Sequence, residues 1–174
     1  TFRRLFSEGS FNAAFVPSYN SELIKGKKKG QIFANNILSL LIIGLFFIVL
    51  LIEILMPGFV WLIAPGFAEN SEKYELTIFL TRITFPFLLF VSLASFFSAI
   101  LNSHNKFGAA AAAPISLNII LILILFFGNY INDELVIYLS YGVTFAGLVQ
   151  LIFLIIYVRK FYIPKISFIF KIQK

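Results

Sequence analysis

The sequence predicts an all-α, polytopic transmembrane helix bundle, and three observations support this fold class. Of the 174 residues, 60% are hydrophobic and only 13% are charged, whereas soluble domains carry about 25% charged residues. The mean hydropathy is +0.94. The apolar residues gather in long segments that approach the roughly 20 residues a helix needs to cross a bilayer. We therefore expect an integral membrane protein with about five membrane helices, over residues 1–20, 35–56, 76–101, 109–127 and 136–158.

The first predicted helix, residues 1–20, is the least apolar of the five. It carries Arg3, Arg4 and Glu8 among phenylalanine and leucine side chains. A charge inside a bilayer costs a few kcal/mol or more, so it is rare there without a function. Helical periodicity places four residues on one polar-to-small face: Arg3, Ser7, Ser10 and Ala14. Arg4 and Glu8 are four residues apart and can pair along the helix.

The second helix follows a lysine-rich loop predicted over residues 18–30. The loop lysines are Lys25, Lys27, Lys28 and Lys29. They are typical of a cytoplasmic loop that obeys the positive-inside rule, and a specific patch for anionic lipids is the alternative. The charge of the second helix is Glu53, one turn from the outer end. Glu53 lies either at the membrane interface or buried among the helices, where it would have a functional role.

A turn and a short surface helix are predicted over residues 57–67. Two Pro-Gly pairs bracket this apolar stretch, which is too short to span a membrane. Trp61 fits the aromatic belt at the interface. The next loop is mostly acidic and is expected on the outer side, with Glu69, Glu72, Lys73 and Glu75.

The third helix, residues 76–101, carries Arg82 and Pro86. Pro86 lacks the N–H that would bond the carbonyl of Arg82, so a kink is expected there. Arg82 either snorkels to the outer interface or lines a cavity. Small side chains predict a face for close helix packing: Ser92, Ala94, Ser95, Ser98 and Ala99.

The last two helices are separated from the third by a short polar connection, residues 102–108. It holds the single histidine, His104, which we expect to be a solvated loop residue. The fourth helix carries Pro114 in its first turns, and an acidic loop precedes the fifth. Ten of the 14 basic residues then fall on the predicted cytoplasmic side: Lys25, Lys27, Lys28, Lys29, Lys106, Arg159, Lys160, Lys165, Lys171 and Lys174.

Several functional classes are disfavoured by composition and motifs. The chain has no cysteine and one histidine, so no thiolate or histidine cluster for a metal is expected. No Ser-His-Asp set, glycine-rich dinucleotide motif or phosphate-binding loop is visible. The net charge of +6 follows from membrane topology, and basic stretches interleaved with aromatic residues are missing. We expect no enzymatic activity, no metal, no cofactor and no nucleic-acid partner, with membrane lipids as surroundings.

The arginines of the first helix suit an anionic substrate. A guanidinium stays charged and can grip a phosphate or pyrophosphate with two parallel hydrogen bonds. Glu8 can neutralise such a site when it is empty. The alternative is a structural Arg4–Glu8 pair that locks two helices together.

The stretch from Arg3 to Pro17, RRLFSEGSFNAAFVP, resembles the second-helix signature of the MurJ/MviN family of bacterial lipid II flippases. Further matches follow in the family's order: APGFA at 64–68, RITFP at 82–86, SLAS at 92–95, AILNSHNKF at 99–107 and the pair Ala113-Pro114. The first motif is specific. The resemblance covers the chain up to about Asn118 and is weaker beyond it.

The resemblance implies a larger, two-lobed flippase of about fourteen helices, within the multidrug/oligosaccharidyl-lipid/polysaccharide exporter superfamily. This chain would be a fragment of the N-terminal lobe, from the later part of helix two to helix six. The family moves the undecaprenyl-pyrophosphate-linked peptidoglycan precursor, lipid II, to the outer leaflet of the bacterial inner membrane by alternating access. The resemblance implies that the function relies on an arginine at the position of Arg3 and that the glutamate matching Glu8 lies near the cavity gate. We take these two as the main substrate-binding candidates and Arg4 as a weaker one. We add Ser7 and Ser10 as substrate-binding candidates, and Arg82 and Pro86 as possible cavity or hinge residues.

Two alternatives remain from the residues alone. A related exporter of drugs or other polysaccharides would be expected to use intramembrane carboxylates more than paired arginines. A non-transporting membrane scaffold would lack a second lobe.

Overall fold

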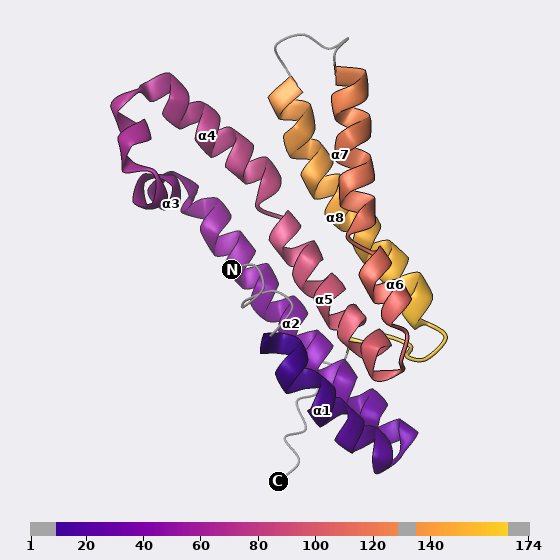
Figure 1. The fold of residues 1–174 in the computed structure, drawn as a ribbon. Helices are drawn as coiled ribbons and strands as arrows, with labels where there is room; N and C mark the ends of the chain where they lie inside the picture. Colours follow the sequence, from indigo (N-terminus) through magenta and orange to yellow (C-terminus); the bar gives the residue numbers. More distant parts are fainter. Residues whose placement is uncertain (1–9, 129–134, 167–174) are drawn as a thin grey trace.

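The computed structural model describes residues 10–128 and 135–166, and this part of the chain is an α-helical bundle (Figure 1). Four helical stretches are long and apolar enough to cross a membrane: Lys27–Ile54, Ser71–Ser103, Phe107–Gly128 and Leu135–Val158. These correspond to the second to fifth predicted helices. The all-α membrane fold is confirmed. The elements are α1 (Ser10–Ile24), α2 (Lys27–Ile54), α3 (Met56–Ile63), the 3₁₀ helix η2 (Pro65–Glu69), α4 (Ser71–Thr84), α5 (Phe87–Ser103), α6 (Phe107–Ala112), α7 (Ile115–Gly128) and α8 (Leu135–Val158).

The predicted lysine-rich loop is wrong in its length. α1 continues to Ile24 with Pro17 inside it, and α2 already begins at Lys27. The turn is therefore limited to Lys25 and Gly26. Lysines are good helix formers, so they extend α2 outward instead of forming a loop.

Two glycines make this tight turn possible. Gly26 has a φ of 138°, which side-chain-bearing residues rarely adopt. Gly30 faces α1, and a β-carbon there would lie 2.6 Å from Cδ2 of Leu23. The α1–α2 hairpin can therefore close with its two helices in direct contact.

Proline breaks two of the predicted helices. α4 ends at Thr84 and α5 begins at Phe87, with Pro86 between them, as the missing N–H predicts. The fourth predicted helix likewise divides at Pro114 into α6 and α7. The fifth predicted helix agrees with α8 to within one residue.

The buried core joins α1, α2, α5 and α8. Along α1, Phe11, Phe15 and Tyr19 recur every four residues and stack with ring centroids 5.3 and 5.4 Å apart. Phe96 of α5 lies tilted against Phe15, with the centroids 5.2 Å apart. Because such rings bury large apolar areas in a defined geometry, this ladder fixes α1 against α5.

Large apolar side chains remain exposed on the outer faces of α2 and α7. They include Phe47, Leu51, Ile54, Ile122 and Phe126. In water such continuous apolar surface would be unfavourable, whereas hydrocarbon solvates it. The chain is therefore a membrane protein.

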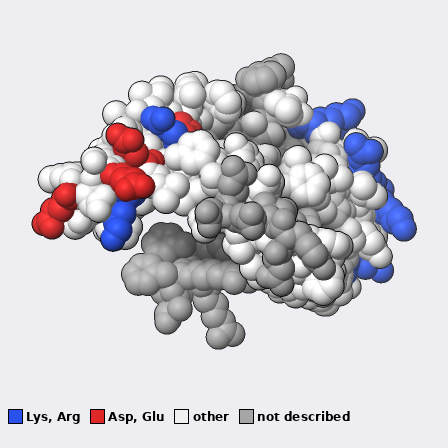
Figure 2. Space-filling view, turned by 90° about the horizontal axis from the view of Figure 1, so that it is seen from above, with Lys and Arg blue, Asp and Glu red and all other residues white. Residues whose placement is uncertain are grey.

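Charged residues separate toward opposite ends of the molecule (Figure 2). The acidic side chains described on η2 and α4 are Glu69, Glu72 and Glu75, with Lys73 among them. The α1–α2 turn, the α5–α6 turn and the residues after α8 carry exposed Lys and Arg. This separation agrees with the predicted orientation, in which the basic end is cytoplasmic.

The residues after α8, 159–166, return along α2 and form what we call the strap. The Tyr162 hydroxyl donates a hydrogen bond to Oδ1 of Asn35 over 2.6 Å. The backbone N–H of Lys165 donates to the same oxygen over 3.1 Å. Tyr162 and Asn35 are buried, so the strap is a fixed part of the bundle.

His104 is not the solvated loop residue that we expected. It is half-buried, its ring stacks on Phe161 of the strap with the centroids 5.1 Å apart, and its Nε2 lies 3.4 Å from the Tyr19 hydroxyl. Burial, together with the nearby Lys27 ammonium, lowers the pKa of His104. The strap, distant in sequence, is what covers it.

Candidate functional site: a polar cavity between α1, α5, α6 and α8

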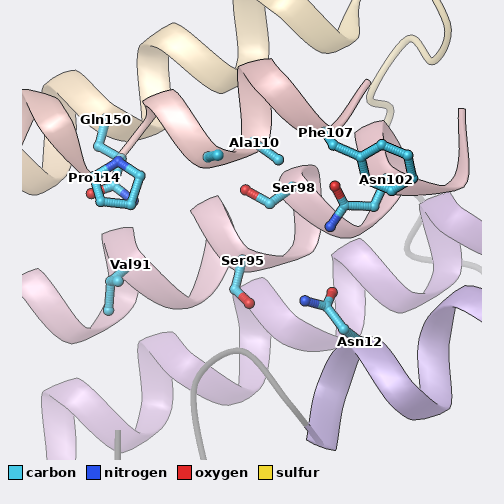
Figure 3. Close-up of a pocket in the computed structure, with 10 residues that line it drawn as sticks. Asn12, Val91, Ser95, Ser98, Asn102, Phe107, Ala110, Pro114 and Gln150 are labelled. Atoms are coloured by element: carbon cyan, nitrogen blue, oxygen red, sulfur yellow. The ribbon is translucent and has the colours of Figure 1, made fainter. Parts of the chain in front are cut away.

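A cavity of about 430 Å³ lies between α1, α5, α6 and α8 (Figure 3). Its polar lining residues all carry amides or hydroxyls: Asn12, Ser95, Ser98, Asn102 and Gln150. The remaining lining is apolar: Val91, Phe107, Ala110, Ala111 and Pro114. No charged side chain contributes to this lining among the described residues.

One face of α5 supplies most of the polar groups. Val91, Ser95, Ser98 and Asn102 are spaced by four, three and four residues, which places them in one row along a helix. The opposite face of α5 carries buried core residues such as Phe96. α5 therefore separates an apolar core from a polar hollow.

Asn12 brings an unsatisfied acceptor to the cavity. Its Oδ1 is buried and has no hydrogen-bond partner among the described residues, and Figure 3 shows its amide directed toward the α5 face. An unpartnered buried acceptor costs about 1–3 kcal/mol. The hollow is thus suited to an occupant that donates hydrogen bonds, such as water or an uncharged hydroxyl or amide group.

Beyond Phe107, the α6 side of the cavity is made of small residues. Ala110 and Ala111 offer little side-chain volume, and Pro114 interrupts the helix next to them. From α8, Gln150 is buried and completes the polar lining. The space persists because Ala110 and Ala111 do not fill it, and the large α6 side chain in the lining, Phe107, is 59% exposed.

Most of the substrate-binding candidates lie outside the described residues. Arg3, Arg4, Ser7 and Glu8 belong to residues 1–9. Ser10 is the first residue of α1. Of the next motif residues, Phe11 packs against the core and Asn12 lines the cavity.

Arg82 and Pro86 do not line this cavity. Arg82 lies in the last turn of α4, is exposed, and sits within electrostatic range of Glu53 on α2. Glu53 is partly buried, and its Oε1 has no hydrogen-bond partner among the described residues. Pro86 marks the break between α4 and α5.

The predicted small-residue packing face is divided in two. Ala94 and Ala99 are buried in the core, as expected for close helix packing. Ser95 and Ser98 instead line the cavity. At these serines the packing face borders a hollow, because their row on α5 forms one wall of the cavity.

Sequence reasoning missed Asn12, Asn102 and Gln150 as members of one site. Each is an amide in or beside an apolar segment, and that signal alone could have marked them. Their convergence on one cavity could not be predicted from local sequence, because the residues come from three separate helices.

A family model described as lipid II flippase MurJ matches residues 1–174. A probable lipid II flippase MurJ from Rickettsia prowazekii (strain Madrid E) is 44% identical over 160 residues, which cover 91% of this chain and 31% of that protein.

Two further relatives carry the same description. The protein from Rhizobium tropici is 44% identical over 166 residues, covering 91% of this chain and 31% of the relative. The protein from Helicobacter pylori (strain ATCC 700392 / 26695) is 35% identical over 152 residues, which cover 87% of this chain and 32% of the relative. The chain thus spans about a third of the length of the curated relatives it matches.

Proposed function

Because the chain belongs to the lipid II flippase MurJ family, we propose that it forms part of a flippase for lipid II. The flippase would carry this pyrophosphate-linked peptidoglycan precursor from the inner to the outer leaflet of the bacterial inner membrane. The observation that carries the proposal is the family match over all 174 residues. Four membrane-length helices with a basic end and an acidic end support it.

The chain would serve as part of the N-terminal lobe of that flippase. Its matches cover about a third of each relative, so the complete transporter needs a further lobe. In alternating access, the two lobes rock about a central substrate site. The core of α1, α2, α5 and α8 would allow the described helices to move as one body.

Arg3 and Arg4 are the groups that we propose to hold the substrate pyrophosphate. Two guanidinium groups can form paired, charge-assisted hydrogen bonds with its oxygens. Glu8 would balance their charge in the empty state, with Ser7 and Ser10 as neutral donors on the same helix. Support comes from α1, whose aromatic ladder fixes the helix directly downstream of these residues.

We propose Pro86 as a hinge, and Arg82 as the charged residue of α4 that moves when α4 tilts about it. Pro86 lies within the α4–α5 break, and Arg82 lies about one turn before it. Tilting of α4 about the break would change the separation of Arg82 and Glu53. Hinges of this kind are local points that absorb backbone rotation while packed helices stay rigid.

Complementation of a bacterium depleted of its own flippase tests the proposal. The full-length gene with Arg3→Ala is expected to lose complementation while the protein still inserts, and Arg3→Lys is expected to retain only part of it. Lys73→Ala, which removes an exposed cation at the acidic end, is the control. Normal growth with Arg3→Ala would contradict the substrate role. Transport of cationic dyes that is lost with Glu8→Gln and kept with Arg3→Ala would favour a drug exporter instead.

A further inference from the structure

The basic end of the molecule carries eight exposed cations in the described residues: Lys25, Lys27, Lys28, Lys29, Lys106, Arg159, Lys160 and Lys165. One acidic residue, Glu22, lies beside them and pairs with Lys25 over 2.6 Å. The other seven have no ion-pair partner within the described ranges. Figure 2 shows Lys and Arg gathered at this end, away from the acidic side chains. The surface therefore carries a concentrated positive charge that the described protein does not neutralise.

Three segments far apart in sequence are held together to form this surface. Asn35 of α2 binds the strap at Tyr162 and Lys165. Nε2 of Gln31 donates to the carbonyl of Ile163 over 3.4 Å. The Lys106 ammonium, from the α5–α6 turn, lies 5.7 Å from the centroid of the Phe161 ring. The positive charges are thus presented by a fixed scaffold rather than by separate loops.

Exposed apolar side chains alternate with these cations. Ile24, which is 88% exposed, adjoins Lys25, and Phe107, which is 59% exposed, adjoins Lys106. On the strap, Ile163 and Ile166 flank Lys165 and are 56% and 57% exposed. A surface for a soluble acidic partner or for nucleic acid does not require isolated aliphatic groups of this kind. A surface that combines basic and apolar side chains matches the boundary between lipid headgroups and acyl chains.

We propose that the basic end is a docking surface for anionic phospholipid headgroups. The lysines and arginines would contact lipid phosphates, and Ile24, Phe107, Ile163 and Ile166 would enter the acyl boundary. The membrane-length helices end at this surface, which places it at the level of the headgroups. This lipid contact is separate from the flippase activity and does not depend on it.

Electrostatic attraction sets the expected size of the effect. Each basic residue near an anionic leaflet strengthens attachment by roughly fivefold, and the effect decays within a Debye length of about 10 Å at 0.1 M salt. Anionic lipid should therefore shield these lysines strongly at low salt and weakly at high salt.

Residue-resolved acetylation of lysines in the full-length protein tests the proposal. The protein is placed in nanodiscs of phosphatidylcholine, with or without phosphatidylglycerol, and peptide mass spectrometry follows each lysine. Acetylation of Lys27, Lys28, Lys160 and Lys165 is expected to slow at least about threefold with phosphatidylglycerol, and the rates should recover at high salt. Lys73, exposed at the acidic end, is the internal reference and should not change.

Equal rates in the two lipids, or slowing that matches that of Lys73, would overturn the proposal. A third sample adds soluble polyglutamate to neutral nanodiscs. Protection in that sample alone would overturn the lipid assignment in favour of an acidic protein partner.

A matched pair of variants tests the apolar contribution. Ile24→Gln is expected to reduce the phosphatidylglycerol protection of the neighbouring lysines about twofold. Ile63→Gln, which changes a 66% exposed isoleucine on α3, is expected to leave it unchanged. Equal protection of the lysines in both variants would overturn the proposal that the isoleucine side chains enter the bilayer.

Discussion

The hydroxyl of Thr144 on α8 donates a hydrogen bond to the backbone carbonyl of Ile83 on α4 over 2.5 Å. Ile83 lies in the last turn before the break at Pro86, where the regular helical pattern of donors ends. α8 also approaches closely just after the break, since a β-carbon at Gly147 would lie 2.5 Å from Cδ2 of Phe87. The kink is therefore stabilised by a neighbouring helix on both of its sides.

Thr144→Val should destabilise the full-length protein by about 1 kcal/mol, because it removes a hydrogen bond between helices in an apolar environment. Reversible unfolding in detergent measures the change, and Thr144→Ser should restore most of the loss. Thr81→Val is the control, since within the described residues the Thr81 hydroxyl donates to the Thr77 carbonyl of its own helix. A loss as large in the control would contradict the special role of Thr144.

Pro86→Ala should straighten the α4–α5 junction. Alanine supplies a backbone N–H that can donate a hydrogen bond to the Arg82 carbonyl. Spin labels at Glu75 and Asn105, both exposed, should move farther apart, and complementation should fall if the break acts as a hinge. Pro57→Ala serves as the control, because a proline in the first turn of α3 costs no helical hydrogen bond. An unchanged distance in Pro86→Ala would show that tertiary contacts alone impose the kink.

Two asparagines should respond in opposite ways to replacement by leucine. Asn35 accepts two hydrogen bonds through its Oδ1, so Asn35→Leu should destabilise the protein by about 1–3 kcal/mol. The Oδ1 of Asn12 is buried without a partner among the described residues, so Asn12→Leu should leave stability unchanged or raise it slightly.

Unfolding and complementation of both asparagine variants separate structure from function. If the polar cavity is needed for transport, Asn12→Leu should impair growth although the protein remains stable. Full activity of Asn12→Leu would assign the cavity a purely structural role.

Acidification should loosen the contact between the strap and α5 through His104. Burial and the Lys27 charge lower the pKa of His104 below its ordinary value of 6.5. Between the lower folded pKa and about 6.5, the unfolded chain therefore binds more protons than the folded protein. The free energy of unfolding decreases as the pH falls through this range.

Thermal unfolding of the full-length protein between pH 8 and pH 5 measures this loss. His104→Gln should flatten the pH dependence of the midpoint in that range, because glutamine does not titrate. An equally steep dependence in the variant would assign the effect to other groups.

The fold class and the two charged ends could be predicted from the sequence, but several boundaries could not. The charge of Lys27–Lys29 suggested a polar loop, whereas their helix propensity extends α2 to Lys27, where Gly30 packs closely against Leu23. His104 resembles any polar loop residue until Phe161 and Tyr19 cover it. The charged residues of the first helix remain a prediction, because residues 1–9 lie outside the described ranges.

Apolar segment length, proline position and charge distribution are local properties, so the sequence by itself determined a membrane bundle, its two charged ends and the breaks at Pro86 and Pro114. The polar cavity depends instead on which faces of distant helices meet. Asn12, Asn102 and Gln150 converge there only after α5 packs against both α1 and α8. Ala110 and Ala111 of α6 leave part of that space unfilled, and such packing is decided by the tertiary structure alone.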